Sequence, residues 1–215
     1  MRYIKGIIFD FDGILVDSEK VNTSAAIKTF EDIGEPLDAA ELTYIPGKSS
    51  VDFIPLFAEK RSIIDTKEQK KIYEQNKKNY NELWDKMAVV PSQIPEIIQS
   101  LSSKKKKLAI ATTNRLEIVE KFFKRSGLNK MFSVVITGEN VKHRKPYPET
   151  YLCAIEQLNL PSKKLLAVED TVVGLSAAKN AGLRCAVLPS NYSKNDDFSR
   201  ADFVIRSILD LLKIV

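Results

Sequence analysis

Two aspartates follow an apolar run near the start of the chain, in the segment GIIFDFDGILVDSE at residues 6–19. Asp10 and Asp12 are two residues apart, so in an extended chain both carboxylates project to the same side, about 6 to 7 Å apart. A buried acid is costly unless it is paired, hydrogen-bonded or bound to a cation. This spacing indicates a site where both carboxylates converge on one ligand.

A second acidic pair ends another apolar run. Glu169 and Asp170 close the segment KLLAVED. Carboxylates gathered in one crevice repel each other and raise each other's pKa unless a cation intervenes. Mg²⁺ suits such a crevice because it is bound by few carboxylates and keeps its other positions for water and phosphate oxygens. We therefore expect Mg²⁺ as the cofactor.

Donors for an anion follow two other apolar runs. Thr112, Thr113 and Asn114 stand where the run KLAIATTN passes into a helical pattern, and hydroxyls, free amides and the helix dipole favour an anion there. Lys145, in HRKPYPE, adds a point positive charge. Metal-binding carboxylates beside anion donors suit a phosphoryl group in transit. One carboxylate can attack phosphorus, while a neighbour gives a proton to the leaving oxygen.

The elements that position these residues alternate between strand and helix. Six short runs are expected to be strands: IKGIIFDFD, KLAIATT, SVVITG, KLLAVED, RCAVL and DFVIRS. From residue 107 onward helical patterns separate them; NRLEIVEKFFKRSG has Asn114 as its expected N-cap and Gly127 as its stop. This alternation predicts an α/β fold with a parallel sheet, whose ligand crevice lies at the carboxyl ends of the strands.

The stretch between the first two expected strands is about 95 residues long, far beyond an ordinary crossover, and its patterns are helical. The longest begins at Thr66, which forms an expected capping box with Gln69. Its aromatic and apolar residues repeat at helical spacing, which predicts packing in a small helical bundle; they are Ile72, Tyr73, Tyr80, Leu83, Trp84 and Met87. A helical insertion over residues 15–90 can cover the aspartates as a lid.

Composition limits the class of protein. The 215 residues are 44% hydrophobic and 28% charged, as is usual for a globular protein, and the sequence has neither a membrane-spanning run nor a signal-peptide pattern, so we expect a cytoplasmic location. The net charge of +5 permits anionic partners, but the basic run at 104–107 lacks aromatic or Arg/Gly interleaving. We expect a monomer or weak dimer without nucleic-acid or membrane partners, and buried thiols at Cys153 and Cys185.

Four motifs together resemble one family. DFDGILVDSE, IATTN, KPYPETY and VEDTVVGLSAAKNAG stand in the order and spacing of the haloacid dehalogenase superfamily. The chain is similar to the β-phosphoglucomutase and phosphoglycolate phosphatase-like branch over nearly its whole length. The resemblance implies a Rossmann-like core formed by residues 1–14 and 91–215, with an α-helical cap at residues 15–90 inserted after the first strand.

The resemblance also implies roles for individual residues. Asp10 would be the nucleophile and Asp12 the general acid/base. The phosphoryl group would be bound by the Thr112 hydroxyl, the Thr113 amide and Lys145. The metal ligands would be Asp10, Asp12 through its backbone carbonyl, Glu169 directly or through water, and Asp170 directly. The implied activity is Mg²⁺-dependent phosphate release from a small phosphorylated metabolite through an aspartyl-phosphate.

The helical insertion departs from mutase-type relatives. Asn22 stands where they have a histidine, and Pro46 where they have a lysine. Ser50 stands at the position of their arginine, which grips the distal phosphate of a bisphosphate. These departures favour hydrolysis of a sugar phosphate or organic acid phosphate, with Gly47 and Lys48 as expected substrate contacts. A β-phosphoglucomutase-like mutase remains the alternative, and a non-catalytic binding protein is a third hypothesis, which the complete catalytic set disfavours.

Overall fold

The computed structural model describes residues 4–215. The chain divides into two compact units: one contains the chain up to Asp17 together with Val90–Val215, and the other is Ser18–Val89. Among the described residues, no helix is both long and apolar enough to cross a membrane.

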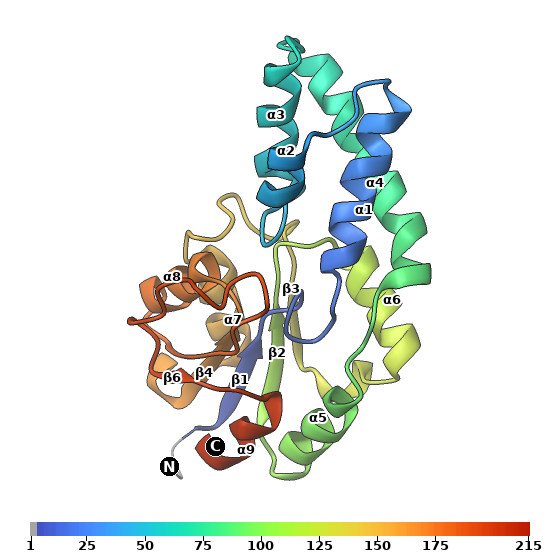
Figure 1. The fold of residues 1–215 in the computed structure, drawn as a ribbon. Coiled ribbons are helices and arrows are strands. Elements are labelled where there is room, and N and C mark those ends of the chain that lie inside the picture. The colour runs from blue at the N-terminus through green and yellow to red at the C-terminus, as the bar shows by residue number, and fades with distance from the viewer. Residues whose placement is uncertain (1–3) are drawn as a thin grey trace. The chain divides into compact units, whose positions relative to one another are not determined.

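The first unit is built on a six-stranded parallel sheet with the strand order β3-β2-β1-β4-β5-β6 (Figure 1). Its strands are β1 (Gly6–Phe9), β2 (Lys107–Ala111), β3 (Val134–Ile136), β4 (Leu165–Glu169), β5 (Arg184–Val187) and β6 (Phe203–Val204). All six expected strands are present, and the predicted parallel α/β architecture is confirmed. Because β1 lies between β2 and β4, its last residue, Phe9, is in register with Ile110 and Val168.

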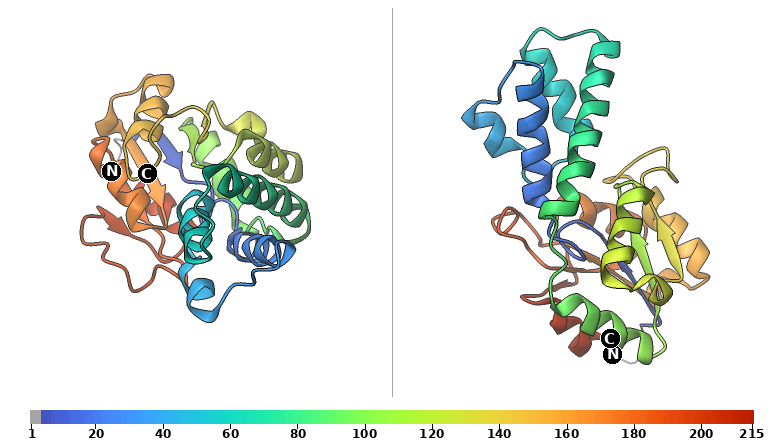
Figure 2. Two further views of the ribbon diagram at one scale, coloured as in Figure 1. Left: turned by 90° about the horizontal axis from the view of Figure 1, so that it is seen from above. Right: turned by 90° about the vertical axis from the view of Figure 1, so that its right-hand side faces the viewer.

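Helices cover both faces of this sheet (Figures 1 and 2). One face carries α5 (Gln93–Ser103) and α6 (Leu116–Ser126), the other α7 (Glu149–Leu158) and α8 (Val172–Asn180). A short helix, α9 (Leu211–Ile214), ends the chain. A sheet covered on both faces has uniformly apolar strands rather than alternating ones, which explains why every residue of β1 is buried.

The second unit consists of the helices α1 (Glu19–Asp32), α2 (Ala39–Tyr44), α3 (Ser50–Lys60) and α4 (Thr66–Met87). The long helical pattern expected to begin at Thr66 corresponds to α4. The views agree that α1 and α4 lie side by side (Figures 1 and 2). The buried face of α4 contains Ile72 and Trp84, as expected, but also Asn76 and Asn79. Both asparagines donate to the hydroxyl of Thr29 on α1, at 3.3 and 3.0 Å, so this helix pair has a polar strip in its interface.

Two local predictions need correction. Asp65 is the N-cap of α4, and its carboxylate accepts a backbone N–H of the first turn at 2.7 Å; the expected capping box of Thr66 with Gln69 is therefore wrong. Cys185 is buried as expected, but Cys153 is only partly buried.

Candidate active site

The carboxyl ends of β1, β2 and β4 lie next to one another at one edge of the sheet. Asp10 directly follows β1, and its N–H donates to the carbonyl of Val168 in β4 at 2.9 Å. Thr112 directly follows β2, while Asp170 follows Glu169, the last residue of β4. The parallel topology therefore brings residues that are up to 160 positions apart in the sequence to one edge.

Lys145, from the connection between β3 and α7, joins this edge. Its Nζ donates to Asp10 Oδ1 at 2.7 Å, to Glu169 Oε1 at 2.6 Å and to the carbonyl of Ala111 at 3.0 Å. Only 6% of the Lys145 side chain is exposed, so these contacts lie in a medium of low dielectric constant, where ion pairs are strong. The structure thus places the ammonium directly against the carboxylate expected to be the nucleophile.

Three carboxylates gather at this edge, and two of them, those of Asp10 and Glu169, contact Lys145. Asp10, Glu169 and Asp170 each offer an oxygen, and these oxygens lie within 4.8 Å of one another; all three residues are buried. One ammonium cannot neutralise three carboxylates, and like charges at this separation are costly without further compensation. Hard oxygen donors and excess negative charge are what Mg²⁺ requires, so the residues present fit a divalent cation.

The pKa values of these buried groups reflect the same excess of negative charge. Burial raises the pKa of Asp10 to about 7; the Lys145 charge opposes this rise, while Glu169 and Asp12 add to it. Burial also raises the pKa of Asp170 well above its usual range, and the charges of Asp10 and Glu169 raise it further. Burial alone would lower the pKa of the Lys145 ammonium, but its ion pairs with Asp10 and Glu169 raise it instead. A bound cation would favour the ionised form of both aspartates.

Asp12 has a partner that the sequence did not reveal. The side-chain Nδ2 of Asn114 donates to Asp12 Oδ2 at 3.2 Å. The N-cap of α6 is Arg115, so the prediction that Asn114 is the N-cap was wrong. Gly127 does end the helix, in a left-handed conformation. The Asn114 amide turns toward the acid expected to transfer protons. The only sequence signal for this contact is the position of Asn114, two residues after Thr112. The high N-cap propensity of asparagine favours a different interpretation of that position.

Two glycines allow the acidic side chains to pack closely. A Cβ on Gly13 would lie 2.0 Å from Asp170 Oδ2, and one on Gly174 would lie 2.0 Å from Glu169 Oε2. Any larger residue would displace a carboxylate. The backbone of Asp170 is also fixed, because the buried hydroxyl of Ser193 donates to the Asp170 carbonyl oxygen at 2.7 Å. Sequence reasoning singled out neither Gly174 nor Ser193.

The two expected substrate contacts outside the core belong to the second unit. Gly47 has a φ of 74° and donates its N–H to Glu19 Oε2 at 3.1 Å. The carbonyl of Lys48 accepts from Asn22 Nδ2 at 3.0 Å, and its exposed side chain places Nζ 5.8 Å from the ring centroid of Tyr44. This loop between α2 and α3 is thus tied to the first turn of α1. The other seven predicted site residues belong to the first unit, on the segments at the carboxyl edge of its sheet. They are Asp10, Asp12, Thr112, Thr113, Lys145, Glu169 and Asp170.

Comparison with known proteins decides the family. Residues 7–188 match the model of the family described as haloacid dehalogenase-like hydrolase. The chain is a haloacid dehalogenase-like hydrolase. A phosphorylated carbohydrates phosphatase of Thermotoga maritima is 34% identical to it over 183 residues, which cover 84% of this chain and 82% of that one. The pyrophosphatase PpaX of Halalkalibacterium halodurans is 28% identical over 221 residues, covering 99% and 97%.

Solved structures agree with this family. The crystal structure of CbbY from Rhodobacter sphaeroides in complex with phosphate has a TM-score of 0.83 and 28% sequence identity to this hydrolase. The match covers 97% of this chain and 96% of that one. The predicted membership of the haloacid dehalogenase superfamily is therefore confirmed, and with it the class of the enzyme, a hydrolase of the phosphatase type.

Proposed function

We propose that this hydrolase is a Mg²⁺-dependent phosphatase that releases phosphate from a small phosphorylated metabolite, a sugar phosphate or an organic acid phosphate, through an aspartyl-phosphate on Asp10. The observation that carries the proposal is the contact of Lys145 Nζ with Asp10 Oδ1 at 2.7 Å inside a cluster of three buried carboxylates. A lysine held in this way compensates negative charge where the carboxylate meets a phosphoryl group.

The first step is the attack of an Asp10 carboxylate oxygen on phosphorus, which breaks the bond from phosphorus to the leaving oxygen. The Asp12 carboxyl group gives its proton to that oxygen, so the metabolite leaves as an alcohol. Thr112 and Lys145 bind the non-bridging phosphoryl oxygens, together with the backbone amide of Thr113. Each contact neutralises charge that grows in the transition state.

The second step hydrolyses the aspartyl-phosphate. The Asp12 carboxylate, now without its proton, takes one from a water molecule, and this water attacks phosphorus. The bond between phosphorus and the Asp10 oxygen breaks, which frees phosphate and restores both aspartates to their starting state.

The metal site of the proposal consists of Asp10, Glu169 and Asp170, together with the backbone carbonyl of Asp12. Mg²⁺ bound there supplies positive charge for the non-bridging oxygens of the phosphoryl group. The name of one relative, a phosphatase of phosphorylated carbohydrates, supports a sugar phosphate as substrate. Another relative is a pyrophosphatase, so pyrophosphate is tested beside the proposed substrates. Lys48, exposed in the second unit, is the side chain that we propose to contact the non-reacting part of the metabolite.

The experiment is phosphate release from sugar phosphates, organic acid phosphates and pyrophosphate, with Mg²⁺ or with a chelator. We expect metal-dependent release that falls by about three orders of magnitude or more in Asp10→Asn, because an amide cannot act as the nucleophile. The matched control is Asp17→Asn, an exposed aspartate of the same segment, which should retain wild-type activity.

The alternative activities give different outcomes in this experiment. No release from any compound, together with isomerisation of a sugar phosphate that requires a bisphosphate primer, would replace the phosphatase by the mutase. If neither activity appears, the proposal is wrong and a binding role takes its place.

A further inference from the structure

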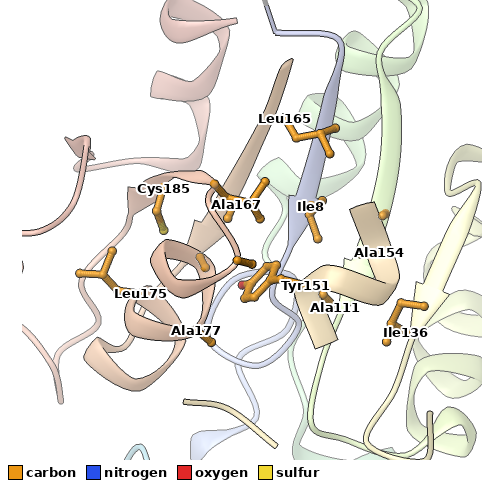
Figure 3. Packing of buried hydrophobic residues seen from close by; sticks show 14 of the residues in the cluster. Ile8, Ala111, Ile136, Tyr151, Ala154, Leu165, Ala167, Leu175, Ala177 and Cys185 are labelled. Atoms are coloured by element: carbon orange, nitrogen blue, oxygen red, sulfur yellow. The ribbon is translucent and has the colours of Figure 1, made fainter. Parts of the chain in front are cut away.

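Tyr151 touches the catalytic cluster from inside the hydrophobic core. It lies on α7, six residues after Lys145, and is fully buried. Figure 3 shows its ring near Ile8 of β1 and Ala111 of β2, among small and branched apolar side chains. Its hydroxyl donates to Glu169 Oε1 at 2.5 Å. A phenylalanine would fill the same space, so the packing does not account for the hydroxyl.

The same residue also contacts Lys145. The ammonium Nζ lies 4.9 Å from the centroid of the Tyr151 ring and 3.5 Å from its oxygen. A buried cation over an aromatic face is attracted by the quadrupole of the ring. Tyr151 therefore meets both members of the Lys145–Glu169 ion pair.

Glu169 and Asp10 compete for this ammonium, at 2.6 and 2.7 Å. A buried carboxylate needs several donors, and the Tyr151 hydroxyl supplies one of them to the same Oε1 that Lys145 contacts. Without this donor, Glu169 would draw the ammonium toward itself and away from Asp10. The hydroxyl and the ring together keep Lys145 shared between the two acids.

We propose that Tyr151 is a positioning residue that holds the Lys145 ammonium on Asp10, through its hydrogen bond to Glu169 and through the ring face that it presents to Nζ. This inference rests on the proposed function, in which Lys145 neutralises charge on the phosphoryl group at Asp10. It predicts a defect in the chemical step rather than in substrate binding or folding.

The test uses Tyr151→Phe, which keeps the ring and removes the hydroxyl. We expect kcat to fall about 10-fold with KM changed less than about twofold, because a hydrogen bond to a charged group is lost. Tyr147→Phe is the matched control: Tyr147 lies in the same motif and is 59% exposed, and kcat should not change. Equal kcat for Tyr151→Phe and wild type would overturn the inference.

A double-mutant cycle separates positioning from a general structural role. If Tyr151 acts through Lys145, Tyr151→Phe should change the residual activity of a Lys145→Met protein by less than about twofold, because coupled residues are non-additive. A full 10-fold loss in that background would contradict the proposal. Replacing Tyr151 by p-aminophenylalanine restores a donor on the same ring and should recover most of kcat; failure of this rescue in a folded protein also contradicts it.

A readout without turnover separates this inference from the proposed function. Beryllium fluoride with Mg²⁺ mimics an acyl-phosphate on an aspartate, and its binding can be followed by ¹⁹F NMR. We expect wild type to bind it and Tyr151→Phe to bind about 10-fold more weakly. Equal binding by both proteins refutes the role of Tyr151 and leaves the proposed function standing. If wild type neither binds it nor releases phosphate from any compound, the proposed function fails and the inference fails with it.

Discussion

The side-chain amide of Asn114 spans the carboxylate of Asp12, with Nδ2 3.2 Å from Oδ2 and 3.4 Å from Oδ1. The rest of Asn114 is also fixed, because its backbone N–H donates to Thr112 Oγ1 at 2.9 Å and its Oδ1 accepts the N–H of Arg115 at 2.9 Å. One residue thus links the expected phosphate-binding hydroxyl to the expected proton-transferring acid.

Removal of this amide should impair proton transfer. We expect Asn114→Ala to lower kcat about 10-fold, because the Asp12 carboxylate loses a hydrogen bond that fixes its orientation. Steady-state phosphate release measures the effect, and Asn195→Ala, at an exposed asparagine, is the control. A wild-type kcat in Asn114→Ala would show that the contact has no role in proton transfer.

Gly174 should not tolerate a side chain although it lies in a helix. Alanine at an ordinary helical glycine stabilises by about 1 kcal/mol, but here the new Cβ would lie 2.0 Å from Glu169 Oε2. Lys145 and Tyr151 hold that carboxylate in place, so it cannot yield freely. We expect Gly174→Ala to destabilise the protein by about 1 to 3 kcal/mol and to weaken Mg²⁺ binding.

Urea unfolding and calorimetric titration with Mg²⁺ measure the two effects of Gly174→Ala. Ser176→Ala, on the same helix and also changing a side chain to alanine, is the control, and its Mg²⁺ affinity should match that of wild type. A stabilised Gly174→Ala protein with unchanged Mg²⁺ affinity would show that the Glu169 carboxylate is free to move.

The ion pair of Glu41 with Arg61 should make the second unit sensitive to acid. Arg61 contacts both carboxylate oxygens, at 2.7 and 2.8 Å, and these hydrogen bonds lower the pKa of Glu41 to about 2. Since the pKa in the folded state lies below the ordinary value of 4.5, the stabilisation is complete above pH 5 and is lost as the pH falls toward 2. Glu41→Gln should cost about 3 kcal/mol at pH 7 and weaken this acid dependence.

Tryptophan fluorescence reports this unfolding, because the one tryptophan of the chain, Trp84, lies on α4 of the second unit. The control is Glu74→Gln, which breaks an ion pair whose carboxylate is 52% exposed; exposed pairs contribute little, so its unfolding should match wild type at every pH. Equal unfolding free energies of Glu41→Gln and wild type at pH 7 would refute the role of this pair.

Substrate preference should respond to Lys48. Because this exposed ammonium sits on a loop fastened by Glu19 and Asn22, we expect Lys48→Ala to raise KM about fivefold for metabolites with a second anionic group, while kcat stays within about twofold. Phosphate release from matched pairs of compounds with and without that group measures the change. Lys70→Ala, at an exposed residue of α4, is the control. If KM rises equally for both members of each pair, Lys48 does not bind the second anionic group.

The sheet was predictable because its strands are continuous apolar runs, and such runs carry a strong signal in a sheet covered on both faces. The acidic pairs were recognisable for a related reason: Asp10 and Glu169–Asp170 interrupt those runs at the strand ends. What the sequence could not supply is contact between distant segments. The hydrogen bond of Tyr151 to Glu169 depends on where α7 packs, and in the sequence Tyr151 is one more apolar helix residue.

Local propensity misled where tertiary contacts dominate. Asn114 is a good N-cap residue, yet the N-cap of α6 is Arg115, and the Asn114 amide donates to Asp12. The polar face of α4 gave no sign that Asn76 and Asn79 are buried, because asparagine in a helix is normally exposed. Their partners come into reach only when α1 packs beside α4: both amides donate to Thr29, and Asn79 also donates to Asp32 at 3.2 Å.

The central place of β1 in the sheet has a consequence for synthesis on the ribosome. β1, which Asp10 directly follows, is made before its two neighbours, because β2 and β4 begin only at Lys107 and Leu165. A nascent chain therefore holds the proposed nucleophile long before it holds Lys145 or the second acidic pair. Chains that stall before β4 is complete lack Glu169 and Asp170, so we expect premature termination to yield fragments without phosphatase activity.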